Sequence, residues 1–339
     1  MVKRKHIKPL PILDYSGFIP KTGSVKVVKK HHYFIITDIS ITGDAPKDFI
    51  SLYNYGTGRK ANIRTWHRYI AKHGHKHYPC EAITEHLLNR IGTVLGFEMA
   101  ESELALLGGQ IRFLSKYFLT NQEVQQLYHG ADLYAGYLND REFVEEIEFL
   151  HKSPDFFTVQ FTEEVLKHLY PQNWQNLMID FVKLLFLDAI IGNNDRHFYN
   201  WGIIKNLENK AEPRFSPIYD TARGLFWNDH EDKIRNILNN KARLQSYIRK
   251  YSEGSSPKIG WEGDEKINHF KLVEKLCTLE ITNNCDTLTN IFSNNKISDV
   301  FTIIDDEFHS LMTPERIDLI KQTLNYRFEI IKKTFTFAQ

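Results

Sequence analysis

One stretch of this chain constrains its fold more than any other: an apolar run that ends abruptly in a cluster of polar side chains. The run, Phe181 to Ile191, contains Lys183 and Asp188. It is too short to span a bilayer, which needs roughly 20 apolar residues. It therefore predicts a buried helix, which we place between Gln172 and Gly192.

After this helix the chain reads GNNDRHFYNWGIIK and, beyond a loop, FSPIYDTARG. The segments WGIIK and FSPI predict a β-hairpin that carries Asn200 and Asp220 to one end of a sheet. Together with Asp195, these side chains offer the oxygen ligands that Mg²⁺ prefers. Phosphoryl transfer needs a protein to hold Mg²⁺, to orient phosphates and to position an acceptor hydroxyl. The stretch therefore predicts a phosphoryl-transfer site, with Asp195 facing the acceptor and Asn200 and Asp220 as metal ligands.

The Asp-Arg-His-x-x-Asn string, the hairpin and the Ile-Tyr-Asp that follows resemble the catalytic and metal loops of the HipA-like serine/threonine kinases, more closely those of the CtkA-type bacterial kinases. The resemblance implies an α+β, bilobal, protein-kinase-like fold. The strand-rich small lobe would comprise residues 1–120 and the mainly helical large lobe residues 121–339. It also implies Asp195 as the catalytic aspartate, Asn200 and Asp220 as magnesium ligands, and His197 as a residue that shapes the catalytic loop.

The same resemblance implies an ATP- and Mg²⁺-dependent protein serine/threonine kinase, capable of autophosphorylation and acting as a toxin or an effector. Its partners would be a protein substrate with a serine or threonine acceptor and a cognate antitoxin. Two alternatives stay open. A phosphoinositide kinase is suggested because the Asp-Arg-His-x-x-Asn string also resembles the phosphatidylinositol kinases, and a pseudokinase would bind nucleotide as a scaffold.

A kinase site also needs a lysine on a strand and a glutamate on the next helix. RTWHRYIAKHG reads as a strand that ends at Lys72, which we expect to contact the nucleotide phosphates. Pro79 suits a first helical position, and apolar residues then recur at helical spacing until Gly96. By the resemblance, Glu81 in the first turn of this helix is the ion-pair partner of Lys72. Glu85, one turn later, is the alternative partner.

A tight turn just before the lysine strand is the predicted phosphate-binding turn. It comprises Gly56, Thr57 and Gly58, and glycine allows backbone N–H groups to approach phosphates closely. A plain hairpin turn between two strands is an equally good interpretation. The segment from Lys21 to Ser24 is a rival for the same role.

The stretch ELALLGGQIRFLSKYFL predicts a second hairpin, which turns at Gly108 and Gly109. Its second strand should run into the hinge beside the adenine of a bound nucleotide. The predicted hinge residues are Ser115, Lys116, Tyr117 and Phe118.

Composition excludes several classes of protein. A net charge of +1 argues against direct nucleic-acid binding, and three cysteines are too few for a disulfide framework, which favours a reducing cytosol. The N-terminal MVKRKHIKPLPIL is basic but lacks the long apolar run of a cleavable signal. We therefore expect a chain with no transmembrane segment that is cytoplasmic, or delivered as an effector without a classical signal peptide.

One group of residues points to another class of function. His73, His75 and His77 alternate, so they would share one face of a strand, with Cys80 and His67 nearby. These are Zn²⁺ ligand types, but the spacing matches no standard zinc module. A metal-dependent binding module is therefore a weaker alternative to the kinase.

Overall fold

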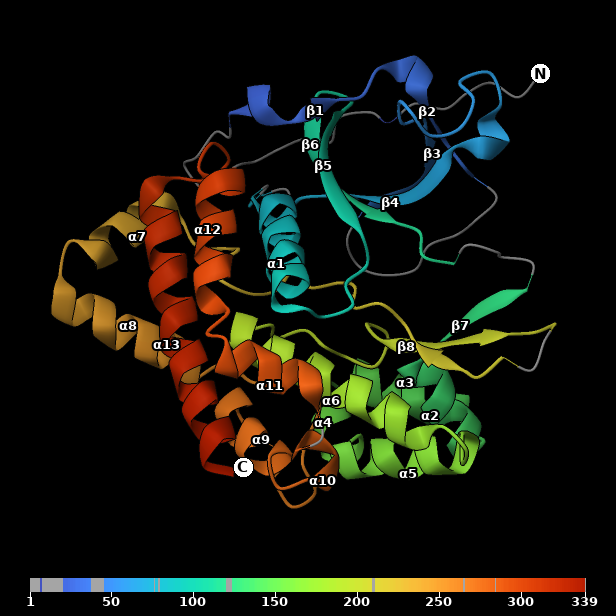
Figure 1. The fold of residues 1–339 in the computed structure, drawn as a ribbon, viewed down its shortest axis with the longest axis vertical. Coiled ribbons are helices and arrows are strands. Elements are labelled where there is room, and N and C mark those ends of the chain that lie inside the picture. The colour runs from blue at the N-terminus through green and yellow to red at the C-terminus, as the bar shows by residue number, and fades with distance from the viewer. Residues whose placement is uncertain are drawn as a thin grey trace.

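A six-stranded sheet and a larger helical region make up the molecule (Figure 1). The computed structural model describes residues 7, 21–37, 46–75, 77–78, 80–119, 124–208, 211–264, 266–283 and 285–338. The mixed α+β architecture expected from the sequence is confirmed.

The six-stranded sheet has the order β1-β5-β6-β4-β3-β2, and its pairs are antiparallel except for β1 with β5. Gly108 and Gly109 both have positive φ at the predicted turn between β5 and β6, which glycine adopts without strain. The strands are β1 (Lys26–Val27), β2 (Tyr33–Ile35), β3 (Lys47–Leu52), β4 (His67–His73), β5 (Ser102–Leu107) and β6 (Gln110–Lys116).

Helix α1 (Glu81–Leu95) lies between this sheet and the helical region (Figure 1). It ends at Gly96, as predicted, in a left-handed conformation with φ of 91°. Its buried apolar side chains, including Leu87 and Ile91, belong to the same core as the large-lobe helices. Pro79, the predicted first helical residue, lies outside the described residues. The helix thus ties the sheet to the rest of the molecule.

The rest of the chain is mainly helical, as expected, with one strand that the sequence did not predict. Within the region that was expected to be mainly helical, Gln125–His129 forms β7, which pairs with the predicted hairpin in the order β7-β8-β9. The described elements are β8 (Gly202–Asn206), β9 (Arg214–Phe215), α2 (Gly130–Leu138), α3 (Arg141–Phe149), α4 (Ser153–Phe156), α5 (Val159–Leu169), α6 (Trp174–Ile191), α7 (Glu231–Leu238), α8 (Lys241–Glu253), α9 (His269–Leu276), α10 (Glu280–Asn283), α11 (Asp286–Ser293), α12 (Ile297–Phe308) and α13 (Pro314–Ala338).

The predicted apolar helix is α6, and it is buried on nearly all sides. Such a helix belongs in the centre of a large core because it has no polar face to present to water. It ends at Gly192, whose φ of 67° turns the chain into the loop that carries Asp195. Among the described residues, no helix has the length and apolar character needed to cross a membrane.

Candidate active site

Lys72 lies on β4 and is held by two carboxylates. Its Nζ donates to Glu85 Oε1 at 2.6 Å and to Asp220 Oδ1 at 3.0 Å. Burial would lower the pKa of Lys72, but the two carboxylates outweigh burial and raise the pKa. The ammonium group is therefore a fixed cation that joins the sheet, α1 and the segment after β9.

The ion-pair partner of Lys72 is Glu85, not Glu81 as predicted. Glu81 lies one turn earlier on α1, where its carboxylate accepts the His75 N–H at 2.7 Å and pairs with Arg223 at 3.2 Å. Residues four apart lie on the same face of a helix, so spacing alone does not choose between the two glutamates. The direction in which β4 approaches α1 makes the choice.

Asp220 has two features that are typical of functional residues. Its φ of 57° is uncommon for a residue other than glycine, and such backbone conformations concentrate at active sites. Burial alone would raise the pKa of Asp220, but Lys72 and more distant cations lower it to about 2. Its carboxylate is therefore ionised at neutral pH, as a metal ligand requires.

The loop after α6 is anchored by a buried ion pair. Asp188 of α6 binds Arg196 at 2.9 Å through Nε and at 3.1 Å through Nη2, and both side chains are almost fully buried. Arg196 Nη1 donates further to the carbonyl groups of Asn200 at 2.6 Å and Tyr219 at 2.5 Å. One guanidinium group therefore joins α6, the loop that carries Asp195 and Asn200, and the segment after β9.

Asp195, His197 and Asn200 lie together in this loop. Asn200 Nδ2 donates to the Asp195 carbonyl at 2.8 Å and lies 3.2 Å from His197 Nε2. His197 Nδ1 accepts the Tyr199 N–H at 3.2 Å, so the ring supports the loop backbone. Burial raises the pKa of Asp195, while His197 and Arg223 oppose that rise.

The residues present fit a magnesium ion. The Asn200 amide oxygen accepts no hydrogen bond from the described residues, and the Asp220 carboxylate is ionised; both are hard oxygen donors. Among the residues that the structure describes, no three His, Cys, Asp or Glu side chains form a metal-binding cluster. The remaining ligands would therefore be water and phosphate oxygens, as Mg²⁺ prefers.

The predicted phosphate-binding turn lies at the other end of the sheet. Gly56, Thr57 and Gly58 do form a tight turn, with φ of 84° and 76° at the glycines. The register of β3 and β4, however, pairs Lys47 with Lys72, whereas the turn follows the opposite end of β3. Five strand residues, roughly 17 Å, separate it from Lys72. Contrary to the prediction, it is the plain hairpin-type turn of the alternative interpretation.

The rival segment also lies elsewhere. The Lys21 N–H donates to the Ser310 carbonyl at 3.2 Å, and the Ser310 hydroxyl lies 2.9 Å from the Ser24 hydroxyl. At the Lys72 end of the sheet, residues 36–46 connect β2 to β3, and 38–45 of these lie outside the described residues.

The first three predicted hinge residues lie beside the lysine strand β4. Ser115 and Lys116 end β6 and pair with β4, and the Tyr117 N–H donates to the Arg68 carbonyl at 2.8 Å. Phe118 then leads toward β7, with its ring centroid 5.7 Å from that of Tyr219. This stretch begins the connection between the two sheets, and its contact with adenine stays a prediction.

The alternating histidines do not form a zinc site within the described part of the chain. His73 instead lies 3.5 Å from Asp48, the His75 and His77 rings lie 5.4 Å apart, and the Cys80 thiol donates to the Trp227 carbonyl. The observed contacts give the metal-dependent binding module no support.

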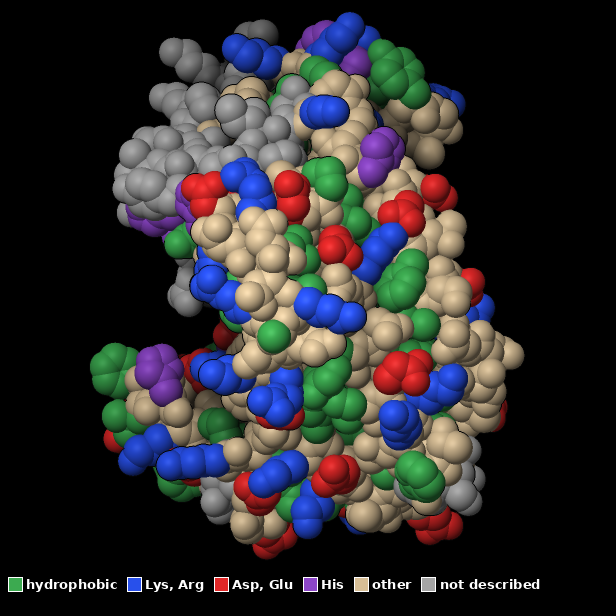
Figure 2. Space-filling model, turned by 90° about the vertical axis from the view of Figure 1, so that its left-hand side faces the viewer, with side chains coloured by type: hydrophobic (Ala, Val, Ile, Leu, Met, Phe, Trp, Pro, Cys, Tyr) green, Lys and Arg blue, Asp and Glu red, His purple; other side chains and the backbone are tan. Residues whose placement is uncertain are grey.

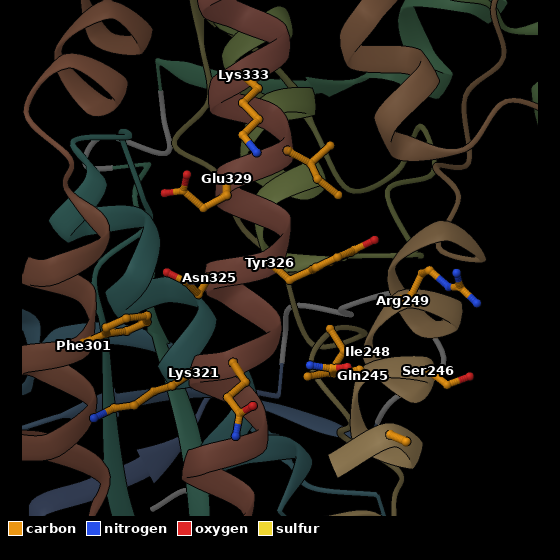
Figure 3. A pocket seen from close by; sticks show the side chains of 13 residues that line it. Gln245, Ser246, Ile248, Arg249, Phe301, Lys321, Asn325, Tyr326, Glu329 and Lys333 are labelled. Carbon is orange, nitrogen blue, oxygen red and sulfur yellow. The ribbon is translucent and has the colours of Figure 1, made fainter.

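A large groove lies away from these residues. It has a volume of about 890 Å³ and runs along α13, with Phe301 of α12 on one side and Arg249 of α8 on the other (Figure 3). Tyr326 and Lys333 of α13 also line it. None of the predicted site residues lines this groove.

Two cations near the site were not predicted. The charge of Lys47 lowers the pKa of Asp220, and the charge of Lys258 opposes the rise in the pKa of Asp195. Only the register of β3 on β4, which pairs Lys47 with Lys72, shows that Lys47 lies near the site. Lys258 belongs to a Gly/Ser/Pro-rich segment that the sequence identifies as a loop, and it is brought close because the Ser255 hydroxyl donates to Asn194 Oδ1 at 2.6 Å. No local signal marks either lysine.

Comparison with known proteins identifies the family of this chain. The family model of the HipA-like C-terminal domain matches residues 39–259, and the chain belongs to this family. The match runs across residue 120, where the boundary between the lobes stays a prediction.

A relative and two solved structures are similar to this chain. The serine/threonine-protein kinase CtkA of Helicobacter pylori strain J99 is 23% identical over 236 residues, which cover 69% of this chain and 66% of the relative. The crystal structure of a Helicobacter pylori proinflammatory kinase CtkA superposes with a TM-score of 0.69 at 19% identity, covering 90% of this chain and 95% of that one. The chain therefore has the fold of CtkA. A Shewanella oneidensis HipA, solved in complex with HipB and operator DNA, is more distant, with a TM-score of 0.47 at 13% identity over 88% of this chain and 67% of that chain.

Proposed function

We propose that this protein is an ATP- and Mg²⁺-dependent protein serine/threonine kinase of the HipA-like type. The observation that carries the proposal is the convergence of Lys72, Glu85 and Asp220 from three separate elements. The loop that holds Asp195 and Asn200 is tied to the Asp220 segment through Arg196. A structural ion pair alone would not need the ionised Asp220 in a left-handed conformation.

Each residue has a defined role in this proposal. Lys72, oriented by Glu85, would contact the nucleotide phosphates, while Asn200 and Asp220 would hold Mg²⁺, which supplies neutralising charge when bound. Asp195 would accept the proton of the serine or threonine hydroxyl. The hydroxyl oxygen would bond to the γ-phosphorus as the bond to ADP breaks and ADP leaves. The hinge residues Ser115, Lys116, Tyr117 and Phe118 would lie beside the adenine.

The finer parts of the proposal rest on the family. The relative CtkA is a serine/threonine-protein kinase, which supports a protein acceptor rather than a lipid. We extend the proposal to autophosphorylation and to action as a toxin or an effector, in the cytoplasm or after delivery without a classical signal peptide. A cognate antitoxin is the partner that a toxin would require.

Transfer of labelled γ-phosphate from ATP tests the proposal. Wild type should label itself or a generic protein acceptor in the presence of Mg²⁺, and Asp195→Ala and Asp220→Ala should each abolish transfer. Transfer that persists in both variants would remove the assignment. Label on phosphoinositide vesicles alone would favour the lipid kinase, and ATP binding without transfer would favour the pseudokinase.

A further inference from the structure

The charge of this protein is divided unevenly along the chain. Residues 1–80 contain fifteen Lys and Arg but four Asp and Glu, a net charge of +11, and residues 49–80 contain no acidic residue. Because the whole chain carries +1, residues 81–339 carry −10. The net charge of +1 is therefore the sum of two oppositely charged parts. The expectation of no nucleic-acid partner rested on that sum alone.

Part of this positive charge gathers on one exposed surface, which we call the basic face. The surface is formed by the turn of the β3–β4 connection and the residues before β2. In Figure 2, Lys, Arg and His side chains lie at the top of the view, over the six-stranded sheet, and the Asp and Glu side chains begin lower. The basic face comprises Lys29, Lys30, His31, Tyr55, Arg59, Lys60 and Arg64, all of them exposed.

The His32 ring contacts both segments of the basic face, and Trp66 fixes part of the β3–β4 connection. The His32 ring centroid lies 4.3 Å from that of His31 and 5.5 Å from that of Tyr55. The Trp66 indole N–H donates to the Arg59 carbonyl at 3.1 Å. Burial lowers the pKa of His32, and His31, Lys60 and Lys29 lower it further, which agrees with a concentration of positive charge here.

The cations of the basic face lack acidic partners within the described part of the chain. Lys29, Lys30, Arg59, Lys60 and Arg64 form no ion pair with any described carboxylate, whereas Lys26 nearby pairs with Glu103. Unpaired cations of one sign create a field that attracts a polyanion.

An aromatic ring stands among these cations. Tyr55 is 76% exposed, an unusual state for a large aromatic side chain, and it belongs to the turn that contains Gly56 and Gly58. Cations that follow a phosphate backbone, with aromatic rings on which bases stack, are the recognition chemistry of single-stranded nucleic acid. An anionic lipid surface would use the cations without needing base stacking.

We propose that the basic face binds single-stranded nucleic acid, with the cations on the phosphates and Tyr55 stacked on a base. The surface lies at the end of the sheet opposite Lys72. Binding there is independent of the proposed kinase activity, and the two proposals fail separately.

Fluorescence anisotropy with a labelled single-stranded oligonucleotide of about 20 nucleotides tests the proposal across a salt series. Each phosphate contact contributes about −0.7 to the slope of log K against log salt for single strands. The variant Lys29→Ala/Lys60→Ala/Arg64→Ala should therefore weaken binding more than tenfold and reduce the slope by about 2. Tyr55→Ala should weaken binding about tenfold and leave the slope unchanged, because stacking releases no counterions.

The matched control neutralises three exposed cations of α8, Lys241→Ala/Arg243→Ala/Lys250→Ala, and should leave both affinity and slope close to wild type. Phosphoryl transfer should be unchanged in all of these variants. Equal losses in the control would show a non-specific effect of net charge and overturn the proposal. It is also overturned if Tyr55→Ala binds like wild type, or if phosphatidylserine vesicles bind while the oligonucleotide does not.

Discussion

Lys72 illustrates how one buried cation can organise a site. It is shared between Glu85 and Asp220; burial raises the pKa of Glu85, and the adjacent Lys72 ammonium opposes that rise and favours the ionised carboxylate. In the proposed kinase, Asp220 would serve as a metal ligand and Glu85 would hold the lysine. The two glutamates of α1 therefore have different roles, although they lie on one helix face.

The first prediction separates these two glutamates. Glu85→Gln should lower kcat/KM for ATP-dependent transfer about a hundredfold, because Lys72 loses its orienting charge. Glu81→Gln should lower it less than tenfold, because Glu81 binds His75 and Arg223 instead. Steady-state kinetics of both variants provides the measurement, and equal losses would contradict the assignment of Glu85.

The buried pair of Asp188 and Arg196 gives a second prediction. Asp188→Asn should lower the free energy of unfolding by about 3 kcal/mol, because it leaves the Arg196 charge buried without a counterion. Asp180→Asn is the control on the same helix. Its pair with Lys183 is partly exposed, so the loss should stay below about 0.5 kcal/mol. Urea unfolding measures both variants, and similar losses would refute the role of the buried pair.

Helix α1 carries a buried histidine that links its packing to pH. The His86 Nδ1 lies 2.9 Å from the Ser102 hydroxyl, and the ring packs near Phe113 and Phe308. Burial, with a smaller contribution from Arg90, lowers the pKa of His86 to about 4. The neutral ring therefore suits the interface between α1, β5 and α12.

This lowered pKa leads to a third prediction. An unfolded histidine titrates near 6.5, so acid favours the unfolded state as pH falls from about 6.5 toward 4. His86 should cost about 2 kcal/mol of stability between pH 7 and pH 5. His86→Gln should reduce the acid loss by about that amount in chemical unfolding at the two pH values. An unchanged pH dependence would show that His86 is not buried in its neutral form.

The C-terminal helix α13 connects the separate parts of the large lobe. Arg316 donates to Glu231 at 2.7 Å and to the Phe226 carbonyl at 2.7 Å. Arg327 donates to the Ala189 carbonyl of α6 at 2.8 Å. These buried contacts hold the segment after Asp220 and the end of α6 in one arrangement, so nucleotide binding should stabilise the molecule as a whole.

The fourth prediction uses this coupling between binding and stability. At an Mg·ATP concentration of 100 times its Kd, the free energy of unfolding should rise by about 2.7 kcal/mol. Chelation of Mg²⁺ with EDTA should remove most of the gain, and Asp220→Asn should not show it, because the variant lacks the charged metal ligand. Thermal unfolding with and without Mg²⁺ provides the measurement. An equal gain in the variant would exclude Asp220 as a ligand.

Features of local sequence were predicted well. The apolar helix ending at Gly192, the hairpin after it, the lysine strand and the helix ending at Gly96 are all confirmed. Each is marked by residues next to one another in the chain, through periodicity or a glycine at a helix end. Strand β7 was not predicted from the sequence, because its pairing partner, β8, lies about 75 residues away in the chain.

What the sequence determined by itself is the set of local elements that carry Asp195, Asn200 and Asp220. Residue type and spacing along the chain are sufficient for that, and they are also what the proposed roles of these three residues rest on. Only the tertiary structure decided that Glu85 holds Lys72 and that the turn at Gly56 lies far from it. Both depend on how β3, β4 and α1 are aligned, and strand register and helix approach are set by packing across the whole core.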